Sequence, residues 1–473
     1  MNTIIKTTSR NDFKAKVYIL NAIEQIDNVS LSQEEINYIN ECYESSKGKK
    51  TIHINRFTEH LYFYIISKEE GCRRLEEARR SGASMTTRIN KHNIEEVLVA
   101  DVAQSNADVL YAYAEGMALA NYQFNKYKSE PKDNSLKTVC FEEGFDEDMI
   151  ERLNVTIEAT LMARDLVNEP VNNLNAVQFA DIVSARLREV GVHVEVFNKK
   201  KIETLKMGGL LAVNAGSLDE PTFTIAEWKP ENHINEKPYV LVGKGVVYDT
   251  GGYNLKTGTY MADMKHDMAG AATVAAALYG IAKTKSPYHV VALIPATDNR
   301  IDGNAHVPGD IVTMFDGTTV EIVNTDAEGR MILADALSYA KKYEPAAVFD
   351  FATLTGAASV AIGPVATVAM HHNAEDAFCQ LKEKGNEVYE RLVEFPLWEE
   401  YEELIKSSVA DIKNVGSKYG GAITAGKFLE HFVDYPWIHF DIAGTAFLDG
   451  RDSYRTQGAT GVHVRLLMKY FEK

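Results

Sequence analysis

Beyond residue 170 the sequence alternates between short apolar runs and longer amphipathic or small-residue runs, which constrains the fold more than any other feature. Strands are expected at Tyr239–Val242, Val290–Pro295 and Ala347–Phe351, and helices over 268–284 and 331–343. This alternation is typical of an α/β protein with a mostly parallel sheet flanked by helices. Further strands are expected at His193–Phe197, Val320–Val323, Val365–Met370 and Ile438–Ile442, and further helices at 176–190, 375–394 and 399–407.

The first 150 residues have the pattern of a smaller α/β domain in which no catalytic constellation stands out. A helical run from Asp146 to Glu169 ends at Pro170 and indicates a linker helix. We therefore expect an N-terminal domain over 1–150, a linker over 151–170 and a catalytic domain over 171–473. The expected N-terminal strands are Val17–Leu20, His60–Ile66 and Glu96–Val99, and the expected helices are Ser32–Glu44, Glu70–Ser81 and Ala107–Lys126.

Composition narrows the function classes. The formal net charge is −17, which disfavours binding to nucleic acid because phosphates need a basic surface. No run of 18 apolar residues suggests a membrane span, and residues 1–6 contain no apolar signal-peptide segment. The four cysteines are scattered without metal or redox spacing and predict thiols in a reducing cytoplasm. They are Cys42, Cys72, Cys140 and Cys379.

The segment Asn324–Arg330, NTDAEGR, carries the densest chemistry. Asp326 and Glu328 are two residues apart, so an extended backbone would direct both carboxylates the same way. Gly329 is expected to let the chain turn, which places Arg330 at a helix start, where free N–H groups attract anions. The segment predicts two hard oxygen ligands for a metal beside a small-anion site. An ordinary capping arrangement is the alternative reading.

A second segment, Val242–Ala271, supports the metal interpretation. Its glycines let backbone and side chains crowd one point after a strand. Asp249 and Asp267 lie in this region, and Lys244 and Lys256 flank Asp249. The Ala-rich run that follows suggests a helix packed tightly against a sheet.

These segments together resemble the leucyl aminopeptidase family of two-metal exopeptidases. The resemblance spans roughly 160–473 and extends to Phe351–Ala357, His439–Gly444 and Gly458–Gly461. It implies two divalent cations, zinc or manganese with cobalt or magnesium as further options. It assigns Lys244, Asp249, Asp267 and Glu328 to one cation, and Asp249, Asp326 and Glu328 to the other.

The charges of these residues agree with those roles. Four carboxylates match two dications, and closely spaced metals need bridging ligands between them. An oxygen-rich set without thiolate suits zinc, manganese or cobalt. Lys244 would have to be neutral to bind a metal. Lowering the pKa of a lysine to near 7 corresponds to a free energy of roughly 4–5 kcal/mol. A solvated lysine at a strand end is the alternative.

The resemblance also implies a mechanism in which a water activated by the two metals attacks the first peptide bond. Lys256 would contact the substrate carbonyl oxygen, and Arg330, with Leu354, would bind a bicarbonate that serves as general base. The substrate's free amino group would sit on a metal, which makes the enzyme an aminopeptidase.

The pocket for the first substrate side chain is implied at Met264, Asp267, Thr353, Gly356 and Ala357. Their character suits an apolar residue such as leucine, although ordinary core packing explains the same residue types. The family further implies a cytoplasmic homohexamer that acts on peptides.

Two other function classes remain open on the sequence alone. A noncatalytic scaffold would be expected to have lost a metal ligand, Lys256 or Arg330, and all are present. Other binuclear hydrolases usually use histidines, yet none of the 13 histidines shows paired ligand spacing. His371 and His372 are expected in a loop. His266, beside Asp267, is interpreted as a bystander, with tuning of the site as the alternative.

Overall fold

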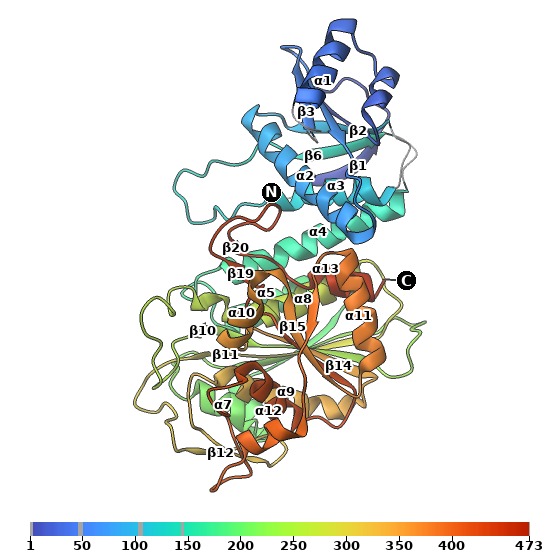
Figure 1. Ribbon diagram of the computed structural model, residues 1–473. Helices are drawn as coiled ribbons and strands as arrows, with labels where there is room; N and C mark the ends of the chain where they lie inside the picture. The colour runs from blue at the N-terminus through green and yellow to red at the C-terminus, as the bar shows by residue number, and fades with distance from the viewer. Residues whose placement is uncertain (1–2, 46–50, 103–106, 143–145, 473) are drawn as a thin grey trace. The chain divides into compact units, whose positions relative to one another are not determined.

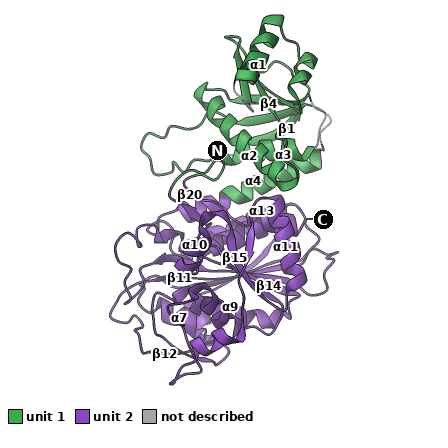
Figure 2. Ribbon diagram, in the orientation of Figure 1, with its two compact units in different colours: residues 1–161, 450–456 green, residues 162–449, 457–473 purple. Residues whose placement is uncertain are grey.

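A computed structural model describes residues 3–45, 51–102, 107–142 and 146–472 (Figure 1). Met1 and Asn2, which begin the segment expected to lack a signal peptide, lie outside these ranges. The chain forms two compact units (Figure 2). Unit 1 comprises Met1–Leu161 and Gly450–Thr456, and unit 2 comprises Met162–Asp449 and Gln457–Lys473. Helix α4 (Glu147–Asn168), the predicted linker, contains the boundary at Leu161.

Unit 1 is built on a six-stranded sheet of order β1-β6-β5-β2-β4-β3, as the sequence pattern predicts for an α/β domain. Its neighbouring strands are parallel except for β3 and β4, which form an antiparallel pair at one edge. The strands are β1 (Ile4–Thr8), β2 (Ala15–Leu20), β3 (Thr51–Asn55), β4 (His60–Ile65), β5 (Glu96–Asp101) and β6 (Thr138–Glu142).

Three main helices accompany this sheet: α1 (Gln33–Ser45), α2 (Gly71–Lys91) and α3 (Ala107–Ala120). Helices α2 and α3 approach backbone to backbone, since a Cβ on Gly82 would lie 2.0 Å from the carbonyl oxygen of Tyr113. The third helix ends at Ala120 rather than at the predicted Lys126, because the turns that follow continue no helical hydrogen bonding.

Unit 2 contains a nine-stranded sheet of order β16-β15-β18-β14-β9-β11-β8-β7, with β10 also paired to β11. Its central pairs are parallel, whereas β11–β8, β8–β7 and β15–β18 are antiparallel. The strands are β7 (His193–Phe197), β8 (Thr222–Trp228), β9 (Tyr239–Gly243), β10 (Gly245–Asp249), β11 (Val290–Asn299), β14 (Ala347–Ala352), β15 (Thr367–His372), β16 (Leu392–Glu394) and β18 (Trp437–Asp441).

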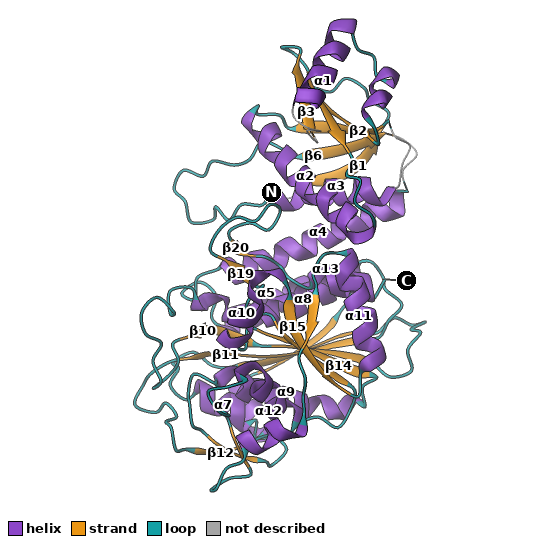
Figure 3. Cartoon of the chain, viewed as in Figure 1, coloured by secondary structure: helices purple, strands orange, loops and turns teal. Residues whose placement is uncertain are grey.

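Helices cover both faces of this sheet, which confirms the predicted fold class (Figure 3). The predicted close packing of the Ala-rich helix is also observed, because a Cβ on Gly270 would lie 1.9 Å from the carbonyl oxygen of Phe351. The helices are α5 (Ala176–Glu189), α6 (Lys199–Leu205), α7 (Gly208–Asn214), α8 (Ala269–Lys283), α9 (Glu328–Ala340), α10 (Gly356–Ile362), α11 (Glu375–Glu387), α12 (Gly421–Glu430) and α13 (Val464–Tyr470).

Several predicted elements differ from the structure. The apolar run Val320–Val323 overlaps β13 (Thr319–Glu321), which pairs with β12 (Ile311–Thr313) and β17 (Ile412–Lys413) in a separate small sheet. The predicted helix 375–394 ends early because Leu392–Glu394 forms an edge strand. The predicted helix 399–407 is a 3-10 helix, η5 (Glu399–Ile405). Apolar content identified each buried segment without specifying its backbone geometry.

Among the residues placed in the structure, no helix combines the length and apolar character needed to cross a membrane.

Candidate metal centre

The candidate centre lies at the carboxyl ends of the central parallel strands in unit 2. Asp249 is the last residue of β10, and Thr353 directly follows β14. Lys244 lies between β9 and β10, where its backbone N–H donates to the carbonyl oxygen of Phe351 at 3.0 Å. Its own carbonyl accepts from the N–H of Ala271 at 2.9 Å. Open α/β sheets place their sites at this end, because loops from neighbouring strands converge there.

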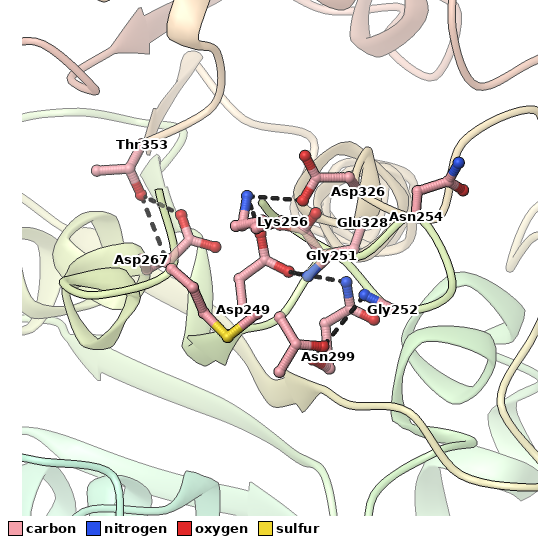
Figure 4. A network of polar contacts seen from close by, with 12 residues as sticks. Asp249, Gly251, Gly252, Asn254, Lys256, Asp267, Asn299, Asp326, Glu328 and Thr353 are labelled. Atoms are coloured by element: carbon pink, nitrogen blue, oxygen red, sulfur yellow. Dashed lines mark hydrogen bonds and ion pairs between the residues drawn. The ribbon is translucent and has the colours of Figure 1, made fainter. Parts of the chain in front are cut away.

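Three carboxylates meet at this point (Figure 4). Asp249, Asp326 and Glu328 each offer an oxygen, and these oxygens all lie within 4.8 Å of one another. Asp249 and Glu328 are buried, whereas Asp326 is partly exposed. Hard oxygen donors at such spacing suit a divalent cation.

Two lysines are paired with the carboxylates. Lys244 Nζ lies 2.7 Å from Asp267 Oδ1 and 2.9 Å from Glu328 Oε1. Lys256 Nζ lies 2.7 Å from Asp249 Oδ2 and 2.6 Å from Asp326 Oδ1. Two ammonium groups therefore face four carboxyl groups, which leaves an excess of negative charge when all are ionised.

The pKa values reflect that excess. Burial, followed by repulsion from Glu328, raises the pKa of Asp249 to about 7. Burial also raises the pKa of Asp267 well above its usual range. Although burial opposes it, attraction to Asp267, Glu328 and Asp249 raises the pKa of Lys244. A buried cluster with more carboxyl groups than ammonium groups is stabilised when further positive charge binds to it.

The carboxyl groups of this centre include an oxygen atom that is available to bind a cation. Asp267 Oδ2 is buried and has no hydrogen-bond partner within the described part of the chain. Its other oxygen accepts from Lys244 and, at 2.7 Å, from the hydroxyl of Thr353. An unsatisfied buried carboxylate oxygen is costly unless a cation or proton binds it. The carboxylates and Lys244 therefore fit divalent metal ions.

Gly329 has a different role from the predicted one. Glu328 begins α9, so Gly329 and Arg330 are its second and third residues, and Asp326 and Glu328 converge across a helix start rather than along an extended strand. A Cβ on Gly329 would lie 2.4 Å from Cε and 2.6 Å from Nζ of Lys244. The glycine is thus required by the close passage of a lysine side chain.

Arg330 is a buried cation with an unused donor. Its Nη1 donates to the carbonyl oxygen of Asn414 at 2.7 Å, while its Nε has no partner among the residues described. Burial lowers its pKa to about 10. A partly unsatisfied guanidinium suits a small anion. The amide of Leu354, predicted at the anion site, donates instead to Asp441 Oδ1 at 3.2 Å.

The residues predicted to line a substrate pocket differ in exposure. Thr353 is buried against Asp267, and Met264, the first residue of η2 (Met264–Met268), is partly exposed. Gly356 and Ala357 are exposed at the start of α10, and a Cβ on Gly356 would meet no atom within 4 Å. The structure therefore places Thr353 against a carboxylate, whereas Gly356 and Ala357 are exposed and Met264 is partly exposed.

Two models of one protein family match this chain. A family model described as the cytosol aminopeptidase family, catalytic domain, matches residues 161–468, and the model of that family's N-terminal domain matches residues 68–131. The chain belongs to the cytosol aminopeptidase family. It is a metal-dependent aminopeptidase, and the resemblance predicted from its motifs is confirmed.

Relatives and solved structures agree with this membership. A probable cytosol aminopeptidase of Chlorobium limicola is 42% identical over 436 residues, covering 86% of each chain. One of Clostridium perfringens is 43% identical over 370 residues, covering 76% of this chain and 75% of that one. A tomato leucine aminopeptidase mutant has a TM-score of 0.87, 27% identity and 99% and 96% coverage. The bottromycin maturation enzyme BotP in complex with Mn has a TM-score of 0.84, 27% identity and 97% and 98% coverage.

Sequence reasoning missed the polar residues that hold the aminopeptidase's carboxylates in place. Asn299, the last residue of β11, donates from Nδ2 to Asp249 Oδ1 at 2.8 Å and to the carbonyl oxygen of Thr325 at 3.0 Å. Thr325 in turn donates to the carbonyl oxygen of Gly251 at 2.6 Å. The sequence feature that could have revealed Asn299 is its position as a polar residue at the end of a largely apolar strand.

The histidines noted in the sequence contribute little to the aminopeptidase centre. His266 stacks on Phe447 with ring centroids 5.0 Å apart, and burial lowers its pKa to about 4. A neutral stacked ring fits the bystander reading. The predicted loop at His371 and His372 is wrong, because both residues end strand β15 and pair with Glu394 and Glu430.

Proposed function

We propose that this aminopeptidase removes the N-terminal residue from peptides, preferring apolar residues such as leucine, with two divalent ions at the centre described above. Lys244, Asp249, Asp267 and Glu328 would hold one ion, and Asp249, Asp326 and Glu328 the other. Zinc and manganese suit the donors best, and cobalt or magnesium would also be accepted. When bound, such ions supply Lewis acidity that activates water and polarises a carbonyl group.

Lys256 is proposed to donate a hydrogen bond to the substrate's developing oxyanion. Although burial opposes it, attraction to Asp249 and Glu328 raises its pKa, so the amine is protonated at neutral pH. A charged donor aimed at a developing oxyanion stabilises the transition state more than the ground state. In the structure its Nζ contacts Asp249 and Asp326, within reach of the same carboxylates that would hold the ions.

Lys244 is proposed to bind as a neutral amine. Here it is an ammonium held by Asp267 and Glu328, so it must release a proton before it can ligate a cation. Thr353 keeps Asp267 oriented for that exchange through its 2.7 Å hydrogen bond. The burial of these groups excludes water and strengthens each interaction.

Arg330 is proposed to hold a bicarbonate ion, which would supply a general base. The free Nε and the lowered pKa of a buried guanidinium support an anion at this point. Arg330 itself would orient the anion and remain charged throughout, since guanidinium does not release its proton at neutral pH. Leu354 would join this site only if its N–H turned away from Asp441.

We further propose a cytoplasmic homohexamer, on the family resemblance alone. Light scattering of the purified protein would give a mass of six chains, and a stable monomeric mass would contradict the assembly.

The observation that carries the proposal is the convergence of Asp249, Asp326 and Glu328 beside a buried, half-satisfied Asp267. The test is hydrolysis of leucine p-nitroanilide after chelation and after zinc, manganese, cobalt or magnesium is restored. We expect activity to vanish with the metal and return with it. The N-acetylated substrate is the control, and its cleavage at a similar rate would contradict an aminopeptidase mechanism.

A further inference from the structure

A cluster of three histidines lies in unit 1. His53 is on the edge strand β3, His60 is on the neighbouring β4, and His92 immediately follows α2. One ring nitrogen from each lies within 4.8 Å of the other two. We propose that these three imidazoles form a further binding site for a divalent transition-metal ion, zinc in the first instance. The sequence of unit 1 contains no other histidine.

The geometry is close to that of a three-histidine site. His53 Nε2 lies 3.0 Å from His60 Nδ1, and the rings of His60 and His92 have centroids 4.4 Å apart. Zinc–nitrogen bonds of about 2.0–2.1 Å in a tetrahedral site place neighbouring nitrogens roughly 3.3 Å apart. The 3.0 Å nitrogen–nitrogen distance is close to that value, and one nitrogen of each ring lies within 4.8 Å of the other two, so rotations of the rings would bring all three nitrogens onto one ion.

Strand pairing explains why the rings converge. The pairs Asn55–His60 and His53–Tyr62 in the β3–β4 hairpin put His53 and His60 diagonally across from each other on one face. His92 is the C-cap of α2, and its ring lies 5.7 Å from that of His53. Three separate elements therefore present the same functional group to one point.

The protonation state suits metal binding. Burial, followed by the proximity of His60 and His92, lowers the pKa of His53 to about 4. Burial and then His92 lower the pKa of His60 as well. Neutral imidazole is the form that binds a metal, so neither ring has to lose a proton at neutral pH.

Neighbouring charges act in both directions. The carboxyl end of α2 presents backbone carbonyl groups whose dipoles favour a cation. Arg88, in the last turn of the same helix, contributes a positive charge that acts on His53 and disfavours one. His92 is exposed, so a fourth coordination position can be filled by water.

Aromatic packing is the simpler explanation. His53 stacks on Tyr62 with centroids 4.5 Å apart and planes 10° apart. Any aromatic side chain would serve such a stack, and it requires nothing of the exposed His92. A hydrogen bond between His53 Nε2 and His60 Nδ1 also accounts for two of the facing nitrogens. Neither the stack nor this hydrogen bond accounts for a nitrogen of His92 lying within 4.8 Å of both, which a shared ion would explain.

The experiment uses the full-length protein, because the catalytic centre also binds metal. Metal-depleted wild type, His92→Gln and the double variant His60→Asn/His92→Gln are equilibrated with zinc and desalted, and zinc per chain is measured. We expect one ion fewer in the double variant and at least tenfold weaker binding of that ion in His92→Gln. Peptidase activity should be unchanged. His431→Gln, an exposed histidine of unit 2, is the matched control and should keep the full amount.

A spectroscopic readout separates the two sites. Copper(II) bound to the histidine cluster would show imidazole nitrogen couplings in pulsed electron paramagnetic resonance, whereas the carboxylate-and-lysine centre offers no imidazole. These couplings should persist in Glu328→Ala and vanish in the double variant. Equal zinc content in all the variants, or no imidazole coupling in wild type, would overturn the proposal without affecting the catalytic assignment.

Discussion

The carboxylate centre of unit 2 and the histidine cluster of unit 1 offer ligands to a metal ion in different ways. In unit 2 the donors are charged, so they require the lysines Lys244 and Lys256 as internal counter-ions, together with deep burial at the ends of parallel strands. In unit 1 the donors are imidazoles at a half-exposed sheet edge, and an imidazole binds a metal without carrying a negative charge that needs a counter-ion. Charged donors thus demand a preassembled network, whereas neutral donors demand only proximity.

The largest expected effect tests the charged network. Glu328→Ala should lower kcat/KM at least about a thousandfold, or about 4 kcal/mol of barrier, because Glu328 is shared by both proposed ions and also pairs with Lys244. Metal analysis and leucine-anilide kinetics are the measurements. Glu383→Gln, an exposed glutamate on α11, is the control. Full metal content with normal turnover in Glu328→Ala would remove the assignment.

Gly329→Ala should be the next most damaging change, although it alters no ligand. The added methyl would displace Lys244, whose Cε lies 2.4 Å from its position. We expect activity to fall about a hundredfold, about 2.7 kcal/mol. Alanine stabilises a helix by up to about 1 kcal/mol relative to glycine. Because this gain opposes the cost of displacing Lys244, the melting temperature should change little. Gly303→Ala, where a Cβ meets no atom within 4 Å, is the matched control. Normal activity in Gly329→Ala would show that Lys244 can move freely.

The two lysines should separate metal binding from catalysis. Lys256→Met is expected to lower kcat about a hundredfold or more while metal content stays normal, as for the loss of an oxyanion donor. Lys244→Met should instead lose bound metal, because it removes a proposed ligand. Kinetics and metal analysis on both variants make the distinction. Lys382→Met, an exposed lysine on α11, is the control, and identical behaviour of the two site variants would contradict their different roles.

The smallest expected effect concerns an ion pair in unit 1. Glu35 accepts two 2.6 Å hydrogen bonds from Arg56, which lower its pKa to about 2. A lowered folded-state pKa contributes stability above the unfolded value of 4.5, and that contribution is lost as the pH falls toward 2. Glu35→Gln should therefore cost about 1 kcal/mol at pH 7, since both partners are partly solvated.

Hydrogen exchange of peptides covering α1 and β3, compared between variants at matched pH, would detect this loss. The difference between wild type and Glu35→Gln should shrink steadily from pH 4.5 downward. Glu44→Gln, an exposed glutamate on the same helix, is the control. A difference that does not change with pH would mean that packing, rather than the ion pair, is lost.

The sequence predicted features that depend on local pattern. Strand-like runs before Lys244 and before Thr353 placed both residues at the ends of parallel strands, where the structure has them. Small residues in α8 predicted its close approach to the sheet, as Gly270 shows. The convergence of Asp249 and Glu328 was implied by the family resemblance and not by local pattern, because their separation in the sequence gave no distance.

Features that depend on tertiary pairing could not be predicted. The three histidines of unit 1 have no ligand spacing, and they meet only because β3 pairs antiparallel with β4 beside the end of α2. Gly329 looked like a turn residue because nothing in its neighbourhood revealed that Lys244 passes over it. Asn299 is the last residue of an apolar strand. Its contact with Asp249 could not be predicted because it depends on the pairing of β10 with β11.

The excursion of residues 450–456 into unit 1 bears on how the chain is made. Tyr454 is buried in the core of unit 1, where its hydroxyl donates to Glu76 at 2.9 Å, and Asp452 pairs with Arg80 at 3.0 Å. Translation makes residues 1–161 before residues 450–456, so this core is complete only when residues 450–456 have left the ribosome. Unit 1 is thus finished only after most of unit 2 has been synthesised, and a product stalled or truncated before residue 450 would present an incomplete apolar core to chaperones and proteases.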